Sequence, residues 1–300
     1  MITGIHILLT YRCTNECDHC FVFGSPQAEG TFTLAQVRTL IEEAEKIGSV
    51  KMIFFEGGEA FLFYPLLLEG VRLAREAGFQ AGIVTNAYFA ATVEDALLWL
   101  RPLADLGLAA LSISDDALHG DGASGPPKHA LEAARQLKIG AGTISIEGPS
   151  VKVPAERKKG EPIVGGGVMF KGRAAEKLTA GLPTIYWREF TECPHEDLAN
   201  PSRVHVDAFG WVHLCQGLCM GNAWETPLSD LIRGYDVKRH PVAAPLSAGG
   251  PARLAADLAA EPEGGFVDAC HLCYATRKRL LDRFPECLAP RRLYGETLSD

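Results

Sequence analysis

The first half of the chain alternates short apolar runs with amphipathic segments, and this order constrains the fold most. Apolar runs of strand length occupy residues 5–10, 50–55, 79–85, 108–114 and 141–146. Apolar residues at helical spacing occupy residues 33–47, 64–77, 93–106 and 127–138. Strand–helix units in unbroken succession predict a parallel sheet with right-handed crossovers. Residues 168–170 are expected to add a sixth strand, and residues 204–206 and 211–214 to form a β-hairpin.

Polar residues gather directly after the predicted strands. Three cysteines follow the first strand, Glu59 the second, Asn86 the third, Asp115 the fourth and Glu147 the fifth. In parallel barrels and open sheets the carboxyl ends of the strands meet at one edge, where active sites lie. The sequence therefore predicts a functional site at this edge.

The cysteines after the first strand are Cys13, Cys17 and Cys20. Thiolates this close in sequence can bind one soft metal centre from a single loop. A closed zinc or iron–sulfur site needs four ligands, so three thiolates leave one position open. Six further cysteines lie in the last third of the chain, and none lies between Cys20 and Cys193. This gap predicts two separate metal centres.

Composition excludes several classes of protein. The formal net charge of −8 argues against wholesale binding to nucleic acid. No apolar stretch is long enough to span a membrane, and the N-terminus has no export signal. We therefore expect a cytoplasmic protein without a membrane partner. In a reducing compartment, clustered cysteines are more often metal ligands than disulfides.

The segment CTNECDHC at Cys13–Cys20 resembles the CxxxCxΦC signature of the radical S-adenosylmethionine (SAM) superfamily, with His19 as the aromatic Φ. The resemblance implies an α/β fold, a partial (β/α)6 TIM barrel. It also implies a 4Fe-4S cluster whose open iron binds SAM, and an electron donor such as flavodoxin or ferredoxin. The reduced cluster would cleave SAM to methionine and a 5′-deoxyadenosyl radical, which takes a hydrogen atom from substrate. The cofactor supplies this chemistry and the protein positions it.

Other positions match the superfamily in order along the barrel. Gly57, Gly58 and Glu59 resemble its GGE motif, which implies contact with the methionine amino group; Ala60 replaces the usual proline. Asn86 resembles a TNG element, with Ala87 in place of glycine. By position alone, the resemblance implies ribose contacts from Ser112, Ser114 and Asp115 and adenine packing at Ile144. A polar capping turn is an equally good interpretation of Asp115, Asp116 and His119.

The last third resembles the SPASM and twitch extensions of the superfamily. Cys193, then the GxxxxC segment Gly210–Cys215, then Cys270 and Cys273 match their spacing. The resemblance implies one auxiliary 4Fe-4S cluster on Cys193, Cys215, Cys270 and Cys273, in a small cysteine-rich domain over residues 186–300 that follows a radical SAM core over residues 1–185. Cys287 has no partner spacing. Cys219 could replace one of the four ligands, although a buried free thiol is the better interpretation.

Two hypotheses of different class follow. The first is a radical SAM enzyme acting on a small molecule or peptide, with the auxiliary cluster assisting electron transfer. The second is a zinc-stabilised binding or assembly protein on a degenerate barrel, because zinc also accepts four thiolates. The histidines His195, His205 and His213, with Asp207, could orient substrate or move a proton, or could be supporting or surface groups. The sequence assigns no catalytic residue, substrate, net reaction or oligomeric state.

Overall fold

A computed structural model of the chain describes residues 1–119, 125–152, 161, 163–259 and 261–296. Its centre is an eight-stranded sheet in the order β11-β10-β9-β1-β2-β3-β4-β5. The strands are β1 (Gly4–Thr10), β2 (Met52–Gly57), β3 (Gln80–Thr85), β4 (Ala110–Ser114), β5 (Gly140–Ile144), β9 (Arg203–Asp207), β10 (Trp211–Cys215) and β11 (Leu218–Asn222). Strands β1 to β5 are parallel, as predicted.

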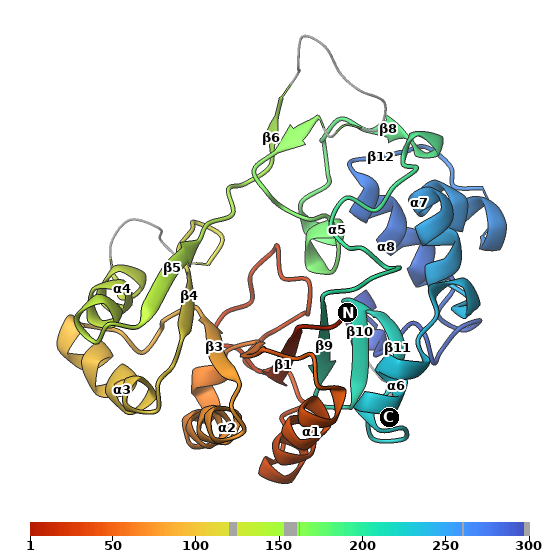
Figure 1. The fold of residues 1–300 in the computed structure, drawn as a ribbon. Helices are drawn as coiled ribbons and strands as arrows, with labels where there is room; N and C mark the ends of the chain where they lie inside the picture. Colours follow the sequence, from red (N-terminus) through yellow and green to blue (C-terminus); the bar gives the residue numbers. More distant parts are fainter. Residues whose placement is uncertain (120–124, 153–160, 162, 260, 297–300) are drawn as a thin grey trace.

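Helices cover the outer face of this sheet. They are α1 (Leu34–Ile47), α2 (Tyr64–Glu76), α3 (Val93–Asp105), α4 (Pro126–Gln136) and α6 (Leu228–Gly234), which lie side by side along one rim of the molecule (Figure 1). The helix α1 begins at Thr33, whose side chain accepts a hydrogen bond from the backbone N–H of Gln36, and ends at Gly48. Alternate residues of β1, including Ile5 and Ile7, pack against these helices. The predicted α/β fold, an open parallel barrel, is confirmed.

The sixth strand predicted at residues 168–170 is wrong. Val168 and Phe170 are not in a strand; they are buried in a small apolar cluster with Ala174 and Val267. The sheet instead grows from the other side of β1, where β9 pairs with it in parallel register. The predicted hairpin is confirmed, because β9 and β10 pair antiparallel.

The remaining elements lie beyond the carboxyl edge and on the β11 side of the sheet (Figure 1). They are β6 (Ser150–Val151), β7 (Val164–Gly165), α5 (Arg173–Lys177), β8 (Ile185–Tyr186), α7 (Ala243–Leu258), β12 (Gly265–Phe266) and α8 (Ala269–Arg279), with short 3-10 helices at Trp187–Glu189, Val237–Arg239 and Arg291–Tyr294. A further 3-10 helix, Ala60–Phe63, lies between β2 and α2. A second apolar core joins this part to the inner face of β1 through Leu8 and Tyr11. The division at residue 185 stays a prediction; the sheet itself continues across it.

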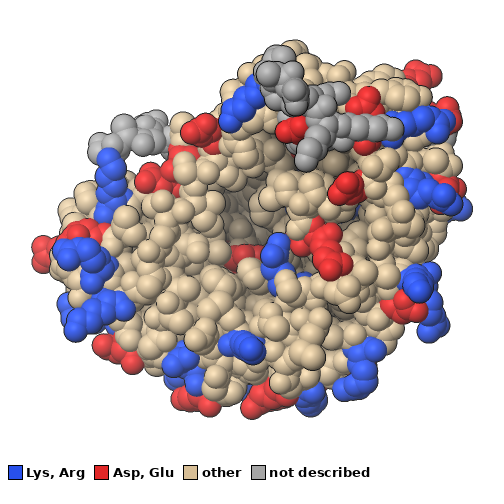
Figure 2. All heavy atoms as spheres, turned by 45° about the horizontal axis from the view of Figure 1, so that its top comes forward, with Lys and Arg blue, Asp and Glu red and all other residues tan. Residues whose placement is uncertain are grey.

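Two features of the whole molecule bear on function. Viewed toward the carboxyl edge, the surface is hollowed at its centre, with acidic side chains in the depth of the hollow (Figure 2). In the described part of the chain, no helix is long and apolar enough to cross a membrane.

Candidate active site

The predicted metal loop follows β1 at the carboxyl edge of the sheet. Cys13, Cys17 and Cys20 all carry partly exposed, unpaired thiols. The start of the loop is fixed by a hydrogen bond from the backbone N–H of Cys13 to the carbonyl oxygen of Ser25, at 3.0 Å. Near its end, the backbone N–H of Gly24 donates to the Cys20 sulfur at 3.3 Å. The three thiols thus occupy one short, backbone-anchored loop.

Arg173, at the start of α5, is hydrogen-bonded to the backbone of this loop. Its guanidinium donates to the carbonyl oxygen of Cys17 at 2.7 Å and to that of Gly24 at 3.0 Å. Its backbone N–H donates to the carbonyl oxygen of Cys20 at 2.9 Å. The Arg173 side chain is buried. One residue therefore binds the middle and the end of the thiol loop.

The paired glycines after β2 are required by close backbone packing. A Cβ on Gly58 would lie 2.2 Å from the carbonyl oxygen of Arg12, and one on Gly57 would lie 2.3 Å from that of Thr10. Gly57 also has a φ of 138°, which side-chain-bearing residues rarely adopt. The glycines let the β2 loop lie directly against the thiol loop.

Glu59 is turned inward. Only 1% of its surface is exposed, and its carboxylate accepts hydrogen bonds from the backbone N–H of Phe61, the hydroxyl of Thr85 and the backbone N–H of Asn86. Burial raises the pKa of Glu59 to about 7, against the opposing effect of these donors. The bonds from Thr85 and Asn86 connect the β2 loop to the end of β3.

Asn86 carries this connection to the thiol loop. Its side-chain Nδ2 donates to the hydroxyl of Thr14 at 2.9 Å and faces the sulfur of Cys13 at 3.7 Å. Glu59 therefore positions Asn86, and Asn86 contacts the first cysteine. The structure brings the predicted residues of β1, β2 and β3 together.

The predicted residues of β4 and β5 lie at the same edge, on the two strands that follow β3 in the sheet. Ser112 and Ser114 pair in register with Gly142 and Ile144, and the backbone N–H of Asp115 donates to the carbonyl oxygen of Ile144 at 2.9 Å. Ile144 is 41% exposed, which is unusual for an isoleucine. This edge offers hydroxyls beside an exposed apolar surface.

His19 packs against the residues that follow β4. Its ring lies edge-on to that of His119 at 4.5 Å, and His119 Nδ1 lies 2.9 Å from the Asp116 carboxylate. Asp116 also accepts from the backbone N–H groups of Leu118 and Ile146. Asp116 thus caps the turn after β4, which supports the capping interpretation for this residue.

Buried cations act on three of the four predicted auxiliary cysteines. Burial raises the pKa of Cys273 to about 11, against the opposing effect of Arg277, and the Cys215 and Cys193 thiols add to the rise. Burial also raises the pKa of Cys270, against the opposing effect of Lys171. Burial alone would raise the pKa of Cys215, but Lys171 and Arg277 outweigh it and lower the pKa.

Lys171 and Arg277 are both buried. Lys171 Nζ lies 3.5 Å from the sulfur of Cys215 and donates to the side-chain oxygen of Gln216 at 2.8 Å. In the described part of the chain, neither cation forms an ion pair with a carboxylate. A buried charge is costly unless it is compensated, so this site favours an anionic occupant.

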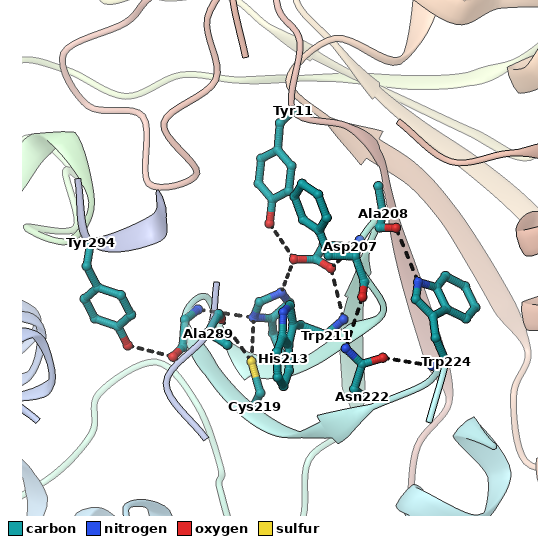
Figure 3. Close-up of polar contacts among 12 residues, drawn as sticks. Tyr11, Asp207, Ala208, Trp211, His213, Cys219, Asn222, Trp224, Ala289 and Tyr294 are labelled. Carbon is teal, nitrogen blue, oxygen red and sulfur yellow. Dashed lines mark hydrogen bonds and ion pairs between the residues drawn. The ribbon is translucent and has the colours of Figure 1, made fainter. Parts of the chain in front are cut away.

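Cys219 is a buried thiol outside this group, as predicted. Its sulfur lies 3.2 Å from His213 Nδ1 and donates to the carbonyl oxygen of Ala289 at 3.1 Å (Figure 3). The backbone N–H of Gly217 also donates to His213 Nδ1, which leaves Nε2 to donate to Asp207. This network is sealed from solvent and joins the hairpin to the C-terminal segment.

Zinc sites and four-iron clusters hold their thiol sulfurs at different distances. Within the described ranges, no three cysteine sulfurs lie within 4.8 Å of one another. A tetrahedral zinc with Zn–S bonds of about 2.3 Å would hold its sulfurs about 3.8 Å apart. A four-iron cluster holds them farther apart, because each sulfur binds a different iron.

The fold and this site define a class: open parallel α/β barrels that bear a thiol loop after the first strand. Residues 7–144 match the family described as Radical SAM superfamily. This part of the chain belongs to the radical SAM superfamily. The predicted family is confirmed for it, together with the 4Fe-4S and SAM character that the superfamily implies.

Two relatives match by sequence. YydG of Bacillus subtilis (strain 168), provisionally named a peptide biosynthesis protein, is 29% identical over 115 residues, 38% of this chain and 36% of YydG. A tungsten-containing aldehyde ferredoxin oxidoreductase cofactor-modifying protein of Pyrococcus furiosus is 30% identical over 114 residues, 38% of this chain and 31% of that protein. The matches thus span about a third of each relative.

The fold also resembles that of a solved structure. The crystal structure of BtrN in complex with AdoMet and 2-DOIA has a TM-score of 0.55 and 16% sequence identity, over 89% of this chain and 97% of BtrN. At this identity the likeness is one of fold, and it extends well beyond residues 7–144.

Sequence reasoning missed two groups of residues. Arg173, Lys171 and Arg277 gave no signal, because single basic residues do not show which loop they contact. His6 and Glu56 gave a weak signal, since each is a polar residue within an apolar strand. His205, predicted as a proton-transfer or supporting residue, lies beside them, and burial lowers its pKa to about 3, against the opposing effect of Glu56.

Proposed function

We propose that this chain is a radical SAM enzyme in which Cys13, Cys17 and Cys20 bind three irons of a 4Fe-4S cluster. The observation that carries the proposal is the loop itself: three unpaired thiols on one anchored loop at the carboxyl edge of the sheet. The fourth iron is left for SAM. When bound, the cluster supplies an electron that cleaves SAM, and the resulting 5′-deoxyadenosyl radical removes a hydrogen atom from substrate.

The surrounding residues hold this centre and its ligand. The N–H of Gly24 and the amide of Asn86 are directed at thiol sulfurs, and such hydrogen bonds tune a cluster's potential. We assign contacts with the ribose hydroxyls to Ser112, Ser114 and Asp115, and packing against adenine to the exposed Ile144. We assign Glu59 a positioning role through Asn86, because its carboxylate is enclosed. We therefore assign contact with the methionine amino group of SAM to the backbone of Gly57 and Gly58.

We assign an auxiliary 4Fe-4S cluster to Cys193, Cys215, Cys270 and Cys273, with electron transfer as its role. The support is the pair of buried cations, because a cluster with four thiolates carries net negative charge that Lys171 and Arg277 would compensate. His195, near Lys171, and Cys219 are outside the proposed ligand set.

The substrate is proposed to be a peptide or a small molecule. The name of the YydG relative supports a peptide, whereas that of the Pyrococcus relative supports a cofactor. We expect the electron donor to be a flavodoxin or ferredoxin.

Anaerobic reconstitution tests the two clusters together. We expect about eight irons per chain, and 5′-deoxyadenosine when reductant and SAM are added. The variant Cys17→Ala should abolish cleavage, while Cys273→Ala should retain cleavage and lose about four irons. Cys287→Ser is the matched control and should keep both clusters.

The contrary outcomes are distinct. Zinc without iron and no 5′-deoxyadenosine would support the zinc-stabilised binding protein instead. Identical behaviour of Cys17→Ala and Cys273→Ala would contradict two centres with separate roles.

A further inference from the structure

A second polar group lies on the inner face of the barrel, away from every cysteine proposed as a ligand. His6 of β1, Glu56 of β2 and His205 of β9 come from three neighbouring strands. His6 Nδ1 lies 3.0 Å from one Glu56 oxygen, and His205 Nε2 lies 3.3 Å from the other. The ligand atoms of all three residues lie within 4.8 Å of one another.

We propose that His6, Glu56 and His205 form a binding site for one divalent first-row metal ion. Two imidazoles and one carboxylate are a donor set that Fe²⁺ and Zn²⁺ use in catalytic sites. With metal–ligand bonds of about 2.1 Å, neighbouring ligand atoms lie about 3.0 Å apart in an octahedron and about 3.4 Å apart in a tetrahedron. Both measured distances fall in this range.

The strands hold the three side chains close together. His6 pairs in register with His205, and their ring centroids are 4.6 Å apart. On its other side the His6 ring stacks on Phe54 at 4.9 Å. The Nδ1 atom of His205 has no hydrogen-bond partner in the described chain, so Glu56 is the group that orients this ring. Little rearrangement is needed for all three to meet one ion.

Asp207, a second carboxylate on the same face, differs from Glu56 in its hydrogen-bond partners. Asp207 accepts from the hydroxyl of Tyr11, from His213 and from the backbone N–H groups of Phe209 and Trp211 (Figure 3). Asp207 is fully buried and its oxygens are saturated. The contacts described for Glu56 are the two imidazoles alone.

The Glu56 site also remains accessible. The side chains of His6 and Glu56 are 19% and 18% exposed. The carboxylate and imidazoles face away from the helices, because their strand neighbours Ile5, Phe55 and Val204 form the core beneath the helices. An oxygen atom of a bound substrate, such as a carboxylate, carbonyl or hydroxyl oxygen, can therefore complete the coordination.

Manganese titration of the oxidised, reconstituted enzyme tests the site. Mn²⁺ prefers oxygen and nitrogen donors to thiolates, so it leaves the clusters intact, and its free aqueous signal can be followed by electron paramagnetic resonance. We expect one bound Mn²⁺ per chain with nitrogen couplings from two imidazoles in pulsed spectra. Affinity should fall in acid, because protons compete with the ion for the three ligands.

Variants locate the ion. Glu56→Gln and His205→Gln should each weaken Mn²⁺ binding more than about tenfold. The comparator is Asp116→Asn, since His19, Asp116 and His119 are the other triad with ligand atoms within 4.8 Å in the described residues. That variant should bind Mn²⁺ as the wild type does.

Absence of binding tighter than about 1 mM in the wild type would overturn the proposal. So would loss of binding in Asp116→Asn with retention in Glu56→Gln. If Glu56→Gln fails to retain its clusters, His205→Gln decides the outcome, since it removes a ligand and leaves the carboxylate.

Discussion

The guanidinium of Arg173 donates a hydrogen bond to the carbonyl oxygen of Cys17, at 2.7 Å, across 156 positions of sequence. A second donor of the same side chain reaches the carbonyl oxygen of Gly24, so Arg173 holds the middle and the end of the thiol loop. Arg173 lies in α5, just after the segment that carries Lys171 beside the auxiliary thiols. The Lys171–Arg173 segment therefore joins the two proposed metal centres.

Replacing Arg173 should loosen the thiol loop. Arg173→Gln removes a buried cation that donates to two carbonyl groups. We expect the free energy of unfolding to fall by about 3 kcal/mol. Arg173→Lys should rescue only partly, because one ammonium cannot reproduce the guanidinium fork. Iron content after reconstitution is the measurement, with Arg188→Gln as the control, since Arg188 is an exposed residue paired with Glu261. Full iron content in Arg173→Gln would contradict this role.

Gly58 should not tolerate a side chain. In Gly58→Ala the new Cβ would meet the backbone oxygen of Arg12, which cannot move without displacing the thiol loop. We expect destabilisation of at least about 2 kcal/mol. Gly142→Ala is the matched control, because no atom lies within 4 Å of its added Cβ. The thermal unfolding midpoint of Gly58→Ala should be clearly lower than that of Gly142→Ala. Equal midpoints would show that the β2 loop can move to make room for the added Cβ.

The buried Glu59 should make stability depend on pH. Burial raises its pKa from 4.5 to about 7, so the folded protein holds this proton where the unfolded chain has lost it. The contribution of Glu59 is therefore fully present below pH 4.5 and is lost as pH rises through about 7. The total is about 3 kcal/mol at 1.36 kcal/mol per pKa unit.

Comparison of the wild type with Glu59→Gln isolates this contribution. Unfolding of the cluster-free protein avoids coupling to metal binding. The difference in unfolding free energy between the two proteins should change between pH 5 and pH 7.5. A constant difference would mean that Glu59 is ionised throughout.

Lys171 should raise the reduction potential of the auxiliary cluster. Its ammonium, 3.5 Å from the Cys215 sulfur, stabilises the more negative, reduced state. Lys171→Gln should therefore lower the midpoint potential, by about 59 mV for each 1.4 kcal/mol of lost interaction. A spectroscopic redox titration measures it. Lys278→Gln is the control, since this exposed lysine on α8 pairs with Glu176; equal shifts in both variants would exclude a local effect of Lys171.

The local signals of the sequence predicted much of the fold. Hydrophobic periodicity located β1 to β5 and their helices, and local capping by Thr33 and Gly48 ends α1 close to the bounds that periodicity predicted. The same reasoning failed at Val168 and Phe170. Apolar residues can be buried in a small cluster as well as in a strand, and periodicity cannot distinguish the two over three residues.

The residues of the candidate site also fall into two groups, those found from the sequence and those found only in the structure. The sequence by itself determined the thiol loop, the paired glycines and the polar residues after each strand, because their spacing is local and strand order brings them to one edge. Only the tertiary structure decided that Glu59 faces inward, that Arg173 and Lys171 hold the two thiol groups, and that His6, Glu56 and His205 meet. These contacts join residues up to 199 positions apart, as His6 and His205 are, and pairing across parallel strands depends on register, which sequence spacing does not contain.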